Sequence, residues 1–108
     1  MSIAKIATAQ EFRNLLSSNI RVVVKFEADW CGPCKVFAPT YENMAKANAG
    51  SISFGKVDVD EANEVAMMEN ISCMPTIKTY LHGKVQETIL GADKDKVQAA
   101  IDSLLKTN

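Results

Sequence analysis

Two cysteines separated by two residues, Cys31 and Cys34, are the side chains of this sequence best suited to chemistry. They lie in the stretch WCGPC (residues 30–34), between an apolar run at residues 22–24 and a segment, residues 35–49, that is typical of a helix. Two thiols at this spacing, where a buried strand becomes a helix, favour reversible disulfide formation. Unpaired N–H groups and the helix dipole at a helix N-terminus stabilise a thiolate, the reactive form of a cysteine. The stretch therefore predicts a redox site with a thiolate at Cys31.

Thiol–disulfide exchange requires an attacking thiolate, an accessible target sulfur and a second thiol that resolves the mixed disulfide. We assign Cys31 as the nucleophile and Cys34 as the resolving thiol. The reason is that Cys31 lies at the helix tip, whereas Cys34 lies one turn further in and is expected to be shielded. Gly32 lets a substrate backbone approach closely. Pro33, in the first helical turn, stiffens the loop without removing a needed hydrogen-bond donor.

A structural zinc site is the competing interpretation of the cysteine pair. Such a site needs two further ligands, and only Cys73 and His82 remain as candidates, at irregular spacing. The sequence has three cysteines, so a disulfide framework would leave one of them unpaired. In a reducing compartment a close cysteine pair is more often catalytic or metal-binding than structural. We therefore favour redox chemistry and expect no metal.

Length and charge exclude several classes of protein. The 108 residues are expected to form one domain, large enough for a single hydrophobic core. A net charge of −1 provides no polybasic surface for nucleic acid or an anionic membrane. No segment approaches the roughly 18 consecutive apolar residues of a membrane span, and residues 1–6 lack the apolar core of a secretory signal. We expect a cytoplasmic protein that binds neither nucleic acid nor membrane.

The apolar pattern predicts alternating strands and helices. Strands are expected at residues 3–6, 20–26, 52–59, 76–81 and 84–90, and helices after the capping box Thr8–Glu11, at 35–49, at about 61–69 and after Asp93. Residues 20–26 are largely apolar, with Lys25 as the exception, which indicates a strand buried on both faces. The alternation implies parallel pairing through right-handed crossovers, and a hairpin at His82-Gly83 adds antiparallel strands. The prediction is a single α/β domain, residues 1–108, with helices on both faces of a mixed sheet.

Two of the expected helices carry specific assignments. Asp58 or Asp60 is expected to cap the helix at 61–69, because short polar side chains satisfy the free N–H groups of a first turn. The apolar residues of that helix are Val65, Ala66 and Met68, and those of the helix at 35–49 are Val36, Phe37, Tyr41 and Met44.

The stretch WCGPCK at residues 30–35, which follows a strand and opens a helix, resembles the active site of the thioredoxin family. Residues 74–76, MPT, resemble the cis-proline segment of that family, and residues 56–60, KVDVD, resemble its third strand. Gly83-Lys84 and Gly91-Ala92 are similar to its hairpin turn and its substrate-facing glycine. The similarity covers nearly the whole chain. It implies a thioredoxin fold, in which four helices flank a central mixed sheet of five strands.

The resemblance also implies a substrate groove beside the cysteines. In the family the bond before the equivalent of Pro75 is cis, so the backbone of Met74 is expected to pair with an extended substrate peptide. The residues expected to form this groove are Trp30, Gly32, Pro33, Met74, Pro75, Gly91 and Ala92.

Lys25 departs from the family pattern, which usually has a buried aspartate that accepts the proton of the resolving thiol. Burial disfavours the charged form of a lysine. In one interpretation the stem of Lys25 is buried and its ammonium reaches water. In the other, Lys25 lies near Cys34 and either stabilises its thiolate as a cation or acts as a base when neutral. Glu27 projects from the same strand face, so it can pair with Lys25 or with Lys56 and partly replace the missing carboxylate, with Lys56 as electrostatic support.

Cys73 is the third cysteine, next to the expected cis-proline. It is either a small buried hydrophobic residue or an exposed thiol near the groove, open to glutathionylation or to a disulfide between two copies of the chain. His82 is assigned to the hairpin turn without a chemical role.

The function that these residues and the resemblance imply is thiol–disulfide exchange. The chain is expected to reduce disulfides of other proteins as a monomer, with a Cys73-linked dimer on oxidation. By resemblance, it binds no cofactor and receives electrons from NADPH through a thioredoxin reductase. The alternative is a binding module of the same fold, in which the groove holds unfolded chains or partners and the redox activity is slow or incidental.

Overall fold

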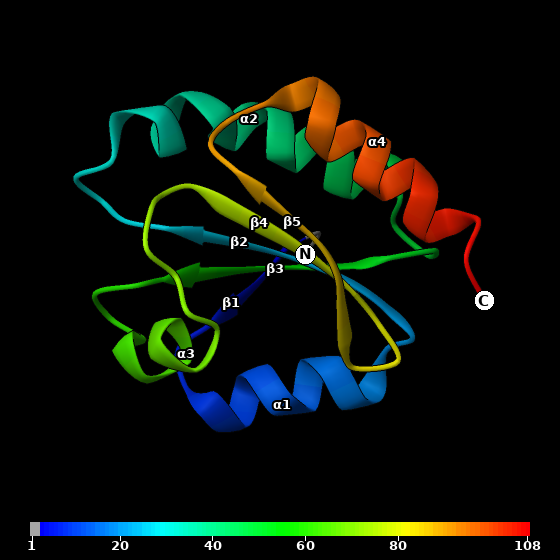
Figure 1. The fold of residues 1–108 in the computed structure, drawn as a ribbon, viewed down its shortest axis with the longest axis horizontal. Coiled ribbons are helices and arrows are strands. Elements are labelled where there is room, and N and C mark those ends of the chain that lie inside the picture. Colours follow the sequence, from blue (N-terminus) through cyan, green and yellow to red (C-terminus); the bar gives the residue numbers. More distant parts are fainter. Residues whose placement is uncertain (1–2) are drawn as a thin grey trace.

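The computed structural model describes residues 3–108, which form one sheet with helices on both faces (Figure 1). In chain order the elements are β1 (Ile3–Ile6), α1 (Ala9–Ser18), β2 (Arg21–Glu27), α2 (Gly32–Ala47), β3 (Ser53–Asp58), α3 (Asn63–Met68), β4 (Thr76–Leu81), β5 (Lys84–Leu90) and α4 (Lys94–Leu105).

The sheet is mixed, with the strand order β1-β3-β2-β4-β5. β3 pairs in parallel with β1 and β2, whereas β4 pairs antiparallel with β2 and β5. Helices α2 and α4 cover one face, and α1 and α3 lie on the other (Figure 1). This arrangement confirms the predicted fold, a five-stranded mixed sheet with four helices.

The central strand β2 is buried on both faces, as predicted. Val22, Val24 and Phe26 are fully buried in a hydrophobic cluster with residues of α1 and α3, and this cluster also contains Cys31 and Cys34. Val23 points to the opposite cluster, between the sheet and helices α2 and α4. Because successive side chains of a strand alternate between faces, β2 belongs to both cores. The strand that leads to the cysteines is therefore held from both sides.

Local capping and turn signals correspond to the observed element ends. Thr8 and Glu11 form the predicted capping box: the Glu11 N–H donates to Thr8 Oγ1 at 3.1 Å, and the Thr8 N–H donates to Glu11 Oε1 at 3.2 Å. Asp93 caps α4 by accepting from the Lys96 N–H at 3.1 Å. The φ angles of residues 82 and 83 are 50° and 80°, as a two-residue hairpin turn requires.

The start of α3 differs from the prediction. The helix begins at Asn63, its N-cap is Ala62, and no side chain caps it. The Asp58 carboxylate instead accepts from the N–H groups of Asp60 and Glu61 at 2.9 and 3.3 Å and closes the turn before the helix. Asp58 therefore accepts from free N–H groups, as an aspartate commonly does, but in the turn before the helix and not in its first turn.

Met68 is exposed, although it was expected on the buried side of α3. With 3.6 residues per turn, it lies about 110° from the middle of the face formed by Val65 and Ala66. In a helix of six residues only those two side chains face the core.

Both tyrosines of the chain are buried and act as interior hydrogen-bond groups. The Tyr41 hydroxyl lies 2.7 Å from the Gly55 carbonyl oxygen and 3.2 Å from that of Val23, and the Tyr80 hydroxyl donates to Glu69. Burial raises the pKa of Tyr41 and of Tyr80 well above the usual value, because it disfavours the phenolate. Because the pKa is higher in the folded than in the unfolded state, the contribution of the two neutral phenols to folding stability is complete below about pH 10. It is lost as the pH rises further.

No helix within residues 3–108 combines the length and the apolar character needed to cross a membrane.

Candidate active site

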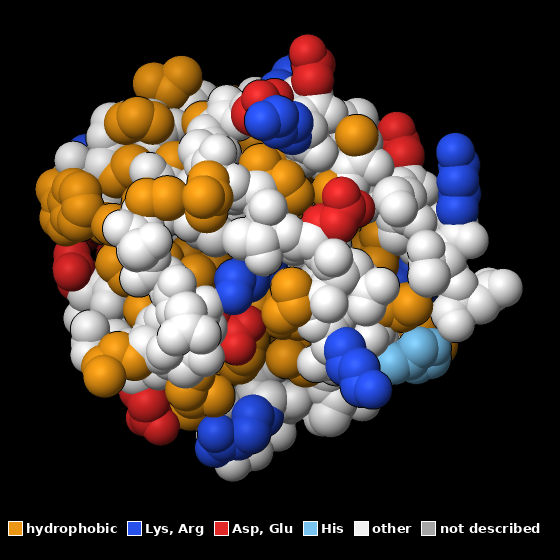
Figure 2. Space-filling view, in the orientation of Figure 1, with side chains coloured by type: hydrophobic (Ala, Val, Ile, Leu, Met, Phe, Trp, Pro, Cys, Tyr) orange, Lys and Arg blue, Asp and Glu red, His pale blue; other side chains and the backbone are white. Residues whose placement is uncertain are grey.

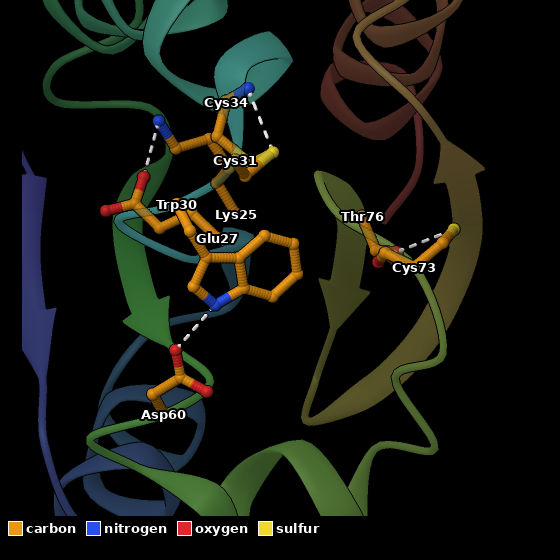
Figure 3. The surroundings of a disulfide bond; sticks show 8 residues. All are labelled: Lys25, Glu27, Trp30, Cys31, Cys34, Asp60, Cys73 and Thr76. Atoms are coloured by element: carbon orange, nitrogen blue, oxygen red, sulfur yellow. Dashed lines mark hydrogen bonds and ion pairs between the residues drawn. A yellow bond between two sulfur atoms is a disulfide. The ribbon is translucent and has the colours of Figure 1, made fainter.

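Cys31 and Cys34 form a disulfide at the beginning of α2, with an S–S distance of 2.31 Å (Figure 3). Cys31 is the N-cap residue of the helix, and the backbone N–H of Cys34 donates to Cys31 Sγ at 3.2 Å. The N–H of Cys31 bonds the carbonyl oxygen of Ala28 at 3.1 Å, which closes the turn between β2 and α2. The helix end therefore directs a free N–H group at the sulfur of Cys31, as its predicted position requires.

The exposures of the two cysteines do not distinguish their roles in this disulfide form. Cys31 is 5% exposed and Cys34 is 3% exposed. The expectation that only Cys34 is shielded is therefore wrong for this form, because both cysteines belong to the same buried hydrophobic cluster. What distinguishes the two is the hydrogen bond from the helix N-terminus, which reaches only Cys31 Sγ among the described residues.

Gly32 and Pro33, the first two residues of α2, are exposed above the disulfide. Apart from its chain neighbours and the backbone of its own helix, a methyl group added at Gly32 would meet no atom within 4 Å among the described residues. Packing within the chain therefore does not require glycine there, and the open space is available to another molecule.

The Met74–Pro75 bond is cis, which confirms the prediction from the resemblance. Pro75 is buried, and Met74 is half-buried against the cluster that contains both cysteines of the disulfide. The carbonyl oxygen of Pro75 accepts a hydrogen bond from the N–H of Gly91 at 2.8 Å. This bond brings the segment after β5, Gly91-Ala92, next to the cis-proline, so the structure joins two groups of predicted groove residues.

Trp30 is 68% exposed, so it is not a core residue. Its indole Nε1–H donates to Asp60 Oδ2 at 2.8 Å, which fixes the ring beside the disulfide (Figure 3). Asp60 was expected to cap a helix or to end the third strand, not to pair with Trp30. Its partner is 30 residues away, and no local pattern in the sequence indicates that pairing.

The apolar surface at this end of the molecule is larger than predicted. Val36, in the first turn of α2, is 80% exposed, and Leu90, at the end of β5, is 64% exposed. Hydrophobic side chains gather where α2 begins (Figure 2). Helical spacing could have separated Val36 from the buried stripe, because Cys34, Phe37 and Tyr41 lie on one face and Val36 does not.

Lys25 is buried and ion-paired. The residue is 2% exposed, and its Nζ atom lies 2.7 Å from Glu27 Oε1 and 5.2 Å from the centre of the Tyr41 ring (Figure 3). The interpretation in which the ammonium reaches water is therefore wrong. Of the two pairings considered for Glu27, the structure has the one with Lys25. The Glu27 side chain, 24% exposed, is the link between the buried ammonium and solvent.

The strand and helix directions place Lys25 under the first turns of α2. The Tyr41 hydroxyl contacts the Val23 carbonyl, and Lys25 lies two residues further along β2, toward the end of the sheet where α2 begins (Figure 1). Cys34 and Tyr41 lie on the same face of α2, at positions i and i+7. Lys25 is therefore on the Cys34 side of Tyr41.

Lys56 is half-buried and lies directly beside Lys25 in the pairing of β2 with β3. Within residues 3–108 it forms no ion pair. Two lysines and one glutamate therefore share this part of the sheet, and the carboxylate pairs with the more deeply buried lysine.

Cys73 is half-buried, and its sulfur points away from the disulfide (Figure 3). Its Sγ atom lies 3.8 Å from Thr76 Oγ1, whose hydroxyl donates to the Cys73 carbonyl oxygen at 2.7 Å. His82 lies in the turn after β4, at the opposite end of that strand from Thr76. Among residues 3–108 no three His, Cys, Asp or Glu side chains are close enough to hold a metal ion.

Comparisons with known proteins agree with this geometry. The family model of thioredoxin matches residues 3–103. Thioredoxin 1 of Plasmodium falciparum is 46% identical over 101 residues, which cover 93% of this chain and 96% of the relative. Thioredoxin of Malassezia sympodialis is 39% identical over 97 residues, with coverages of 89% and 92%.

Solved structures lead to the same group of proteins. The structure of Plasmodium falciparum thioredoxin superposes with a TM-score of 0.89 at 42% identity, covering 93% of this chain and 97% of the other. The oxidised form of mitochondrial thioredoxin 3 from Saccharomyces cerevisiae superposes with a TM-score of 0.90 at 35% identity, with coverages of 95% and 96%. The similarity therefore extends over the whole domain and not the cysteine stretch alone.

The ion pair of Lys25 and Glu27 yields a prediction about stability. Glu27→Gln should lower the free energy of unfolding by about 3 kcal/mol, because it leaves a buried ammonium without its counter-charge. The double variant Lys25→Met/Glu27→Gln should recover most of that loss, since no buried charge remains. Urea denaturation of the three proteins measures both effects.

Glu61→Gln is the matched control for this experiment. Glu61 pairs with Lys5 at 3.3 Å, but the two side chains are 54% and 63% exposed. Removing an exposed pair should change the free energy of unfolding by less than about 1 kcal/mol. Equal effects of Glu27→Gln and Glu61→Gln would contradict a buried ion pair at Lys25.

Proposed function

Because this chain belongs to the thioredoxin family of thiol–disulfide oxidoreductases, we propose that Cys31 is the attacking thiol and Cys34 the resolving thiol of a protein-disulfide reductase. The observation that carries this assignment is the hydrogen bond from the Cys34 N–H to Cys31 Sγ at the N-terminus of α2. A hydrogen bond to the charged form and the positive end of a helix dipole both stabilise a thiolate.

The reaction follows from this assignment in two steps. The Cys31 thiolate attacks one sulfur of a substrate disulfide, forms a mixed disulfide with it, and releases the other substrate sulfur, which takes up a proton. Cys34 then loses its proton and attacks Cys31 Sγ, which releases the second substrate sulfur as a thiol. The substrate gains two electrons and two protons, and the chain is left with the disulfide between Cys31 and Cys34.

In this proposal Lys25 supports the second step, in which Cys34 must lose its proton. Lys25 is a buried cation on the Cys34 side of Tyr41, and an opposite charge nearby favours a thiolate. Glu27 is partly exposed and bonded to the ammonium, so it connects this site to solvent and supplies the carboxylate that the family usually has at the position of Lys25. Lys56, beside Lys25 in the sheet, adds electrostatic support.

The proposed substrate groove has an apolar surface and a stretch of backbone without hydrogen-bond partners among the described residues. Within residues 3–108 the backbone of Met74 forms no hydrogen bond, so its polar groups can pair with an extended substrate chain. The apolar side chains around it fit the hydrophobic flanks of a disulfide in a partly unfolded protein. The residues that we assign to substrate binding are Trp30, Gly32, Pro33, Met74, Pro75, Gly91 and Ala92.

Electrons for each cycle are proposed to come from NADPH through a thioredoxin reductase, with no cofactor bound to this chain. A dithiol carrier of this kind works in a compartment that keeps thiols reduced, which supports a cytoplasmic location. Reduction of the disulfide by NADPH and reductase, followed as loss of NADPH absorbance, tests the electron source. Cell fractionation tests the location.

The binding-module alternative is not favoured by the comparisons. The relatives named above are thioredoxins with 46% and 39% identity over most of the chain. The cysteine pair at disulfide distance, at a helix N-terminus, is also more than a passive groove requires.

Substitution of each cysteine tests the assigned order. Cys31→Ser should abolish reduction of insulin, because the thiol assigned to attack the substrate disulfide is removed. Cys34→Ser should also stop turnover, but it should accumulate a mixed disulfide between Cys31 and the substrate, which non-reducing electrophoresis detects. If the mixed disulfide instead accumulates in Cys31→Ser, the two roles are reversed.

Replacing Lys25 tests its part in the second step. Lys25→Met removes the cation that favours the Cys34 thiolate. The rate–pH profile for insulin reduction should therefore move toward alkaline pH by about one unit. Lys56→Met, which removes the half-buried neighbouring cation, should shift the profile less. Profiles of Lys25→Met and Lys25→Asp that both coincide with the parent would rule out a role for Lys25 in proton transfer.

We further propose that the chain is a monomer and that oxidation links two copies through Cys73, which is half-buried beside Thr76. After mild oxidation the parent should run partly as a dimer on a non-reducing gel, and Cys73→Ser should run as a monomer. A dimer band that persists in Cys73→Ser would assign the link to another cysteine.

A further inference from the structure

The segment that carries the cis-proline, residues 69–75, is anchored at its start by a partly buried polar cluster. The side chain of Glu69 is 17% exposed, and its Oε1 atom accepts a hydrogen bond from the hydroxyl of Tyr80. The ammonium of Lys78, whose side chain is 12% exposed, donates to the Glu69 carbonyl oxygen at 2.6 Å and lies 3.9 Å from Oε1. Glu69 is therefore held through both its side chain and its backbone.

The two donors belong to the rigid part of the molecule. Lys78 and Tyr80 are two residues apart on β4, so they project from the same face of the sheet. Tyr80 is almost completely buried, and its ring packs edge-to-face against Phe12 of α1 with 5.9 Å between the ring centres. Because the acceptor belongs to the segment and the donors to the sheet, the cluster fixes where the segment leaves α3.

The rest of the segment is held by backbone hydrogen bonds, by the bond from the Thr76 hydroxyl to the Cys73 carbonyl oxygen, and by packing of Ile71 and Met74 against the core. The N–H of Ile71 donates to the Ala66 carbonyl oxygen at 3.0 Å, and the far end is held by the bond from Gly91 to Pro75. Hydrogen bonds to a charged carboxylate are stronger than those between neutral groups. The hydrogen bonds and ion pair of Glu69 are therefore the strongest polar contacts at the α3 end of residues 69–75.

We propose that Glu69, Lys78 and Tyr80 are positioning residues for protein substrates. They hold residues 69–75 so that the Met74 backbone is placed to pair with a substrate whose disulfide has reached Cys31. Their side-chain hydrogen bonds and ion pairs are with one another, so their effect on the reaction passes through the segment. The inference rests on the proposed function, because the placement matters only if Met74 binds substrate.

Tyr80→Phe is the sharpest test, because it removes the hydroxyl and keeps the ring against Phe12. The KM for insulin should rise roughly fivefold, with kcat unchanged. The rate with a small aryl disulfide, which presents no extended backbone, should equal that of the parent. Exchange of the backbone amide hydrogens of residues 70–74 should become faster. Glu69→Gln, which keeps an acceptor oxygen but loses the charge, should give a smaller rise in KM.

Thr8→Ala is the matched control, since it removes one side-chain hydrogen bond from the cap of α1, outside this segment. It should leave the KM for insulin unchanged. An unchanged KM in Tyr80→Phe, or an equal loss of rate with insulin and with the small disulfide, would overturn the inference. The proposed function would still hold in that case, provided that the parent reduces insulin. A parent that reduces neither substrate would overturn the proposed function instead. If Tyr80→Phe does not fold, Glu69→Gln decides by the same comparison of the two substrates.

Discussion

The hydrogen bond from the N–H of Cys34 to the sulfur of Cys31 is the interaction on which the arrangement of this domain depends. It requires that Cys31 lie at a helix N-terminus, so the chain must turn from β2 into α2 within a few residues. That turn stays in place because β2 is buried on both faces and because the Tyr41 hydroxyl of α2 bonds the carbonyl oxygens of two strands. The two hydrophobic cores therefore keep Cys31 Sγ at the N-terminus of α2.

The charge next to this site is arranged in an unusual way. A cation occupies the buried position where the family usually has a carboxylate, and the carboxylate, Glu27, lies two residues further along the same strand face. A buried charge is stable only with a partner at good geometry, and the 2.7 Å contact with Lys25 meets that requirement. The substitution therefore moves the carboxylate toward solvent and places a proton-bearing group in the interior, while the pair as a whole remains neutral.

The parts of the fold that follow local rules were predictable from the sequence. The capping box at Thr8, the cap at Asp93 and the hairpin turn at His82 each depend on residues within a few positions of one another. The burial of Lys25 and the bond between Trp30 and Asp60 were not predictable, because each depends on where distant segments meet. Side-chain preferences indicate that an aspartate will accept a hydrogen bond, but not which donor it finds.

The proposed substrate groove depends on contacts that the sequence does not reveal. Gly32 and Pro33 begin α2, but the other residues assigned to the groove, Trp30, Met74, Pro75, Gly91 and Ala92, lie in turns and bends outside the helices and strands. Single hydrogen bonds between distant residues help to fix these segments: Trp30 to Asp60, Gly91 to Pro75, and Tyr80 to Glu69. The bonds at Glu69 and at Pro75 hold the two ends of the cis-proline segment, and the bond to Asp60 holds Trp30 separately, so none of the three involves the cysteine sulfurs. Changes in one bond can therefore alter substrate preference while the cysteine pair, which the two cores hold, keeps its chemistry.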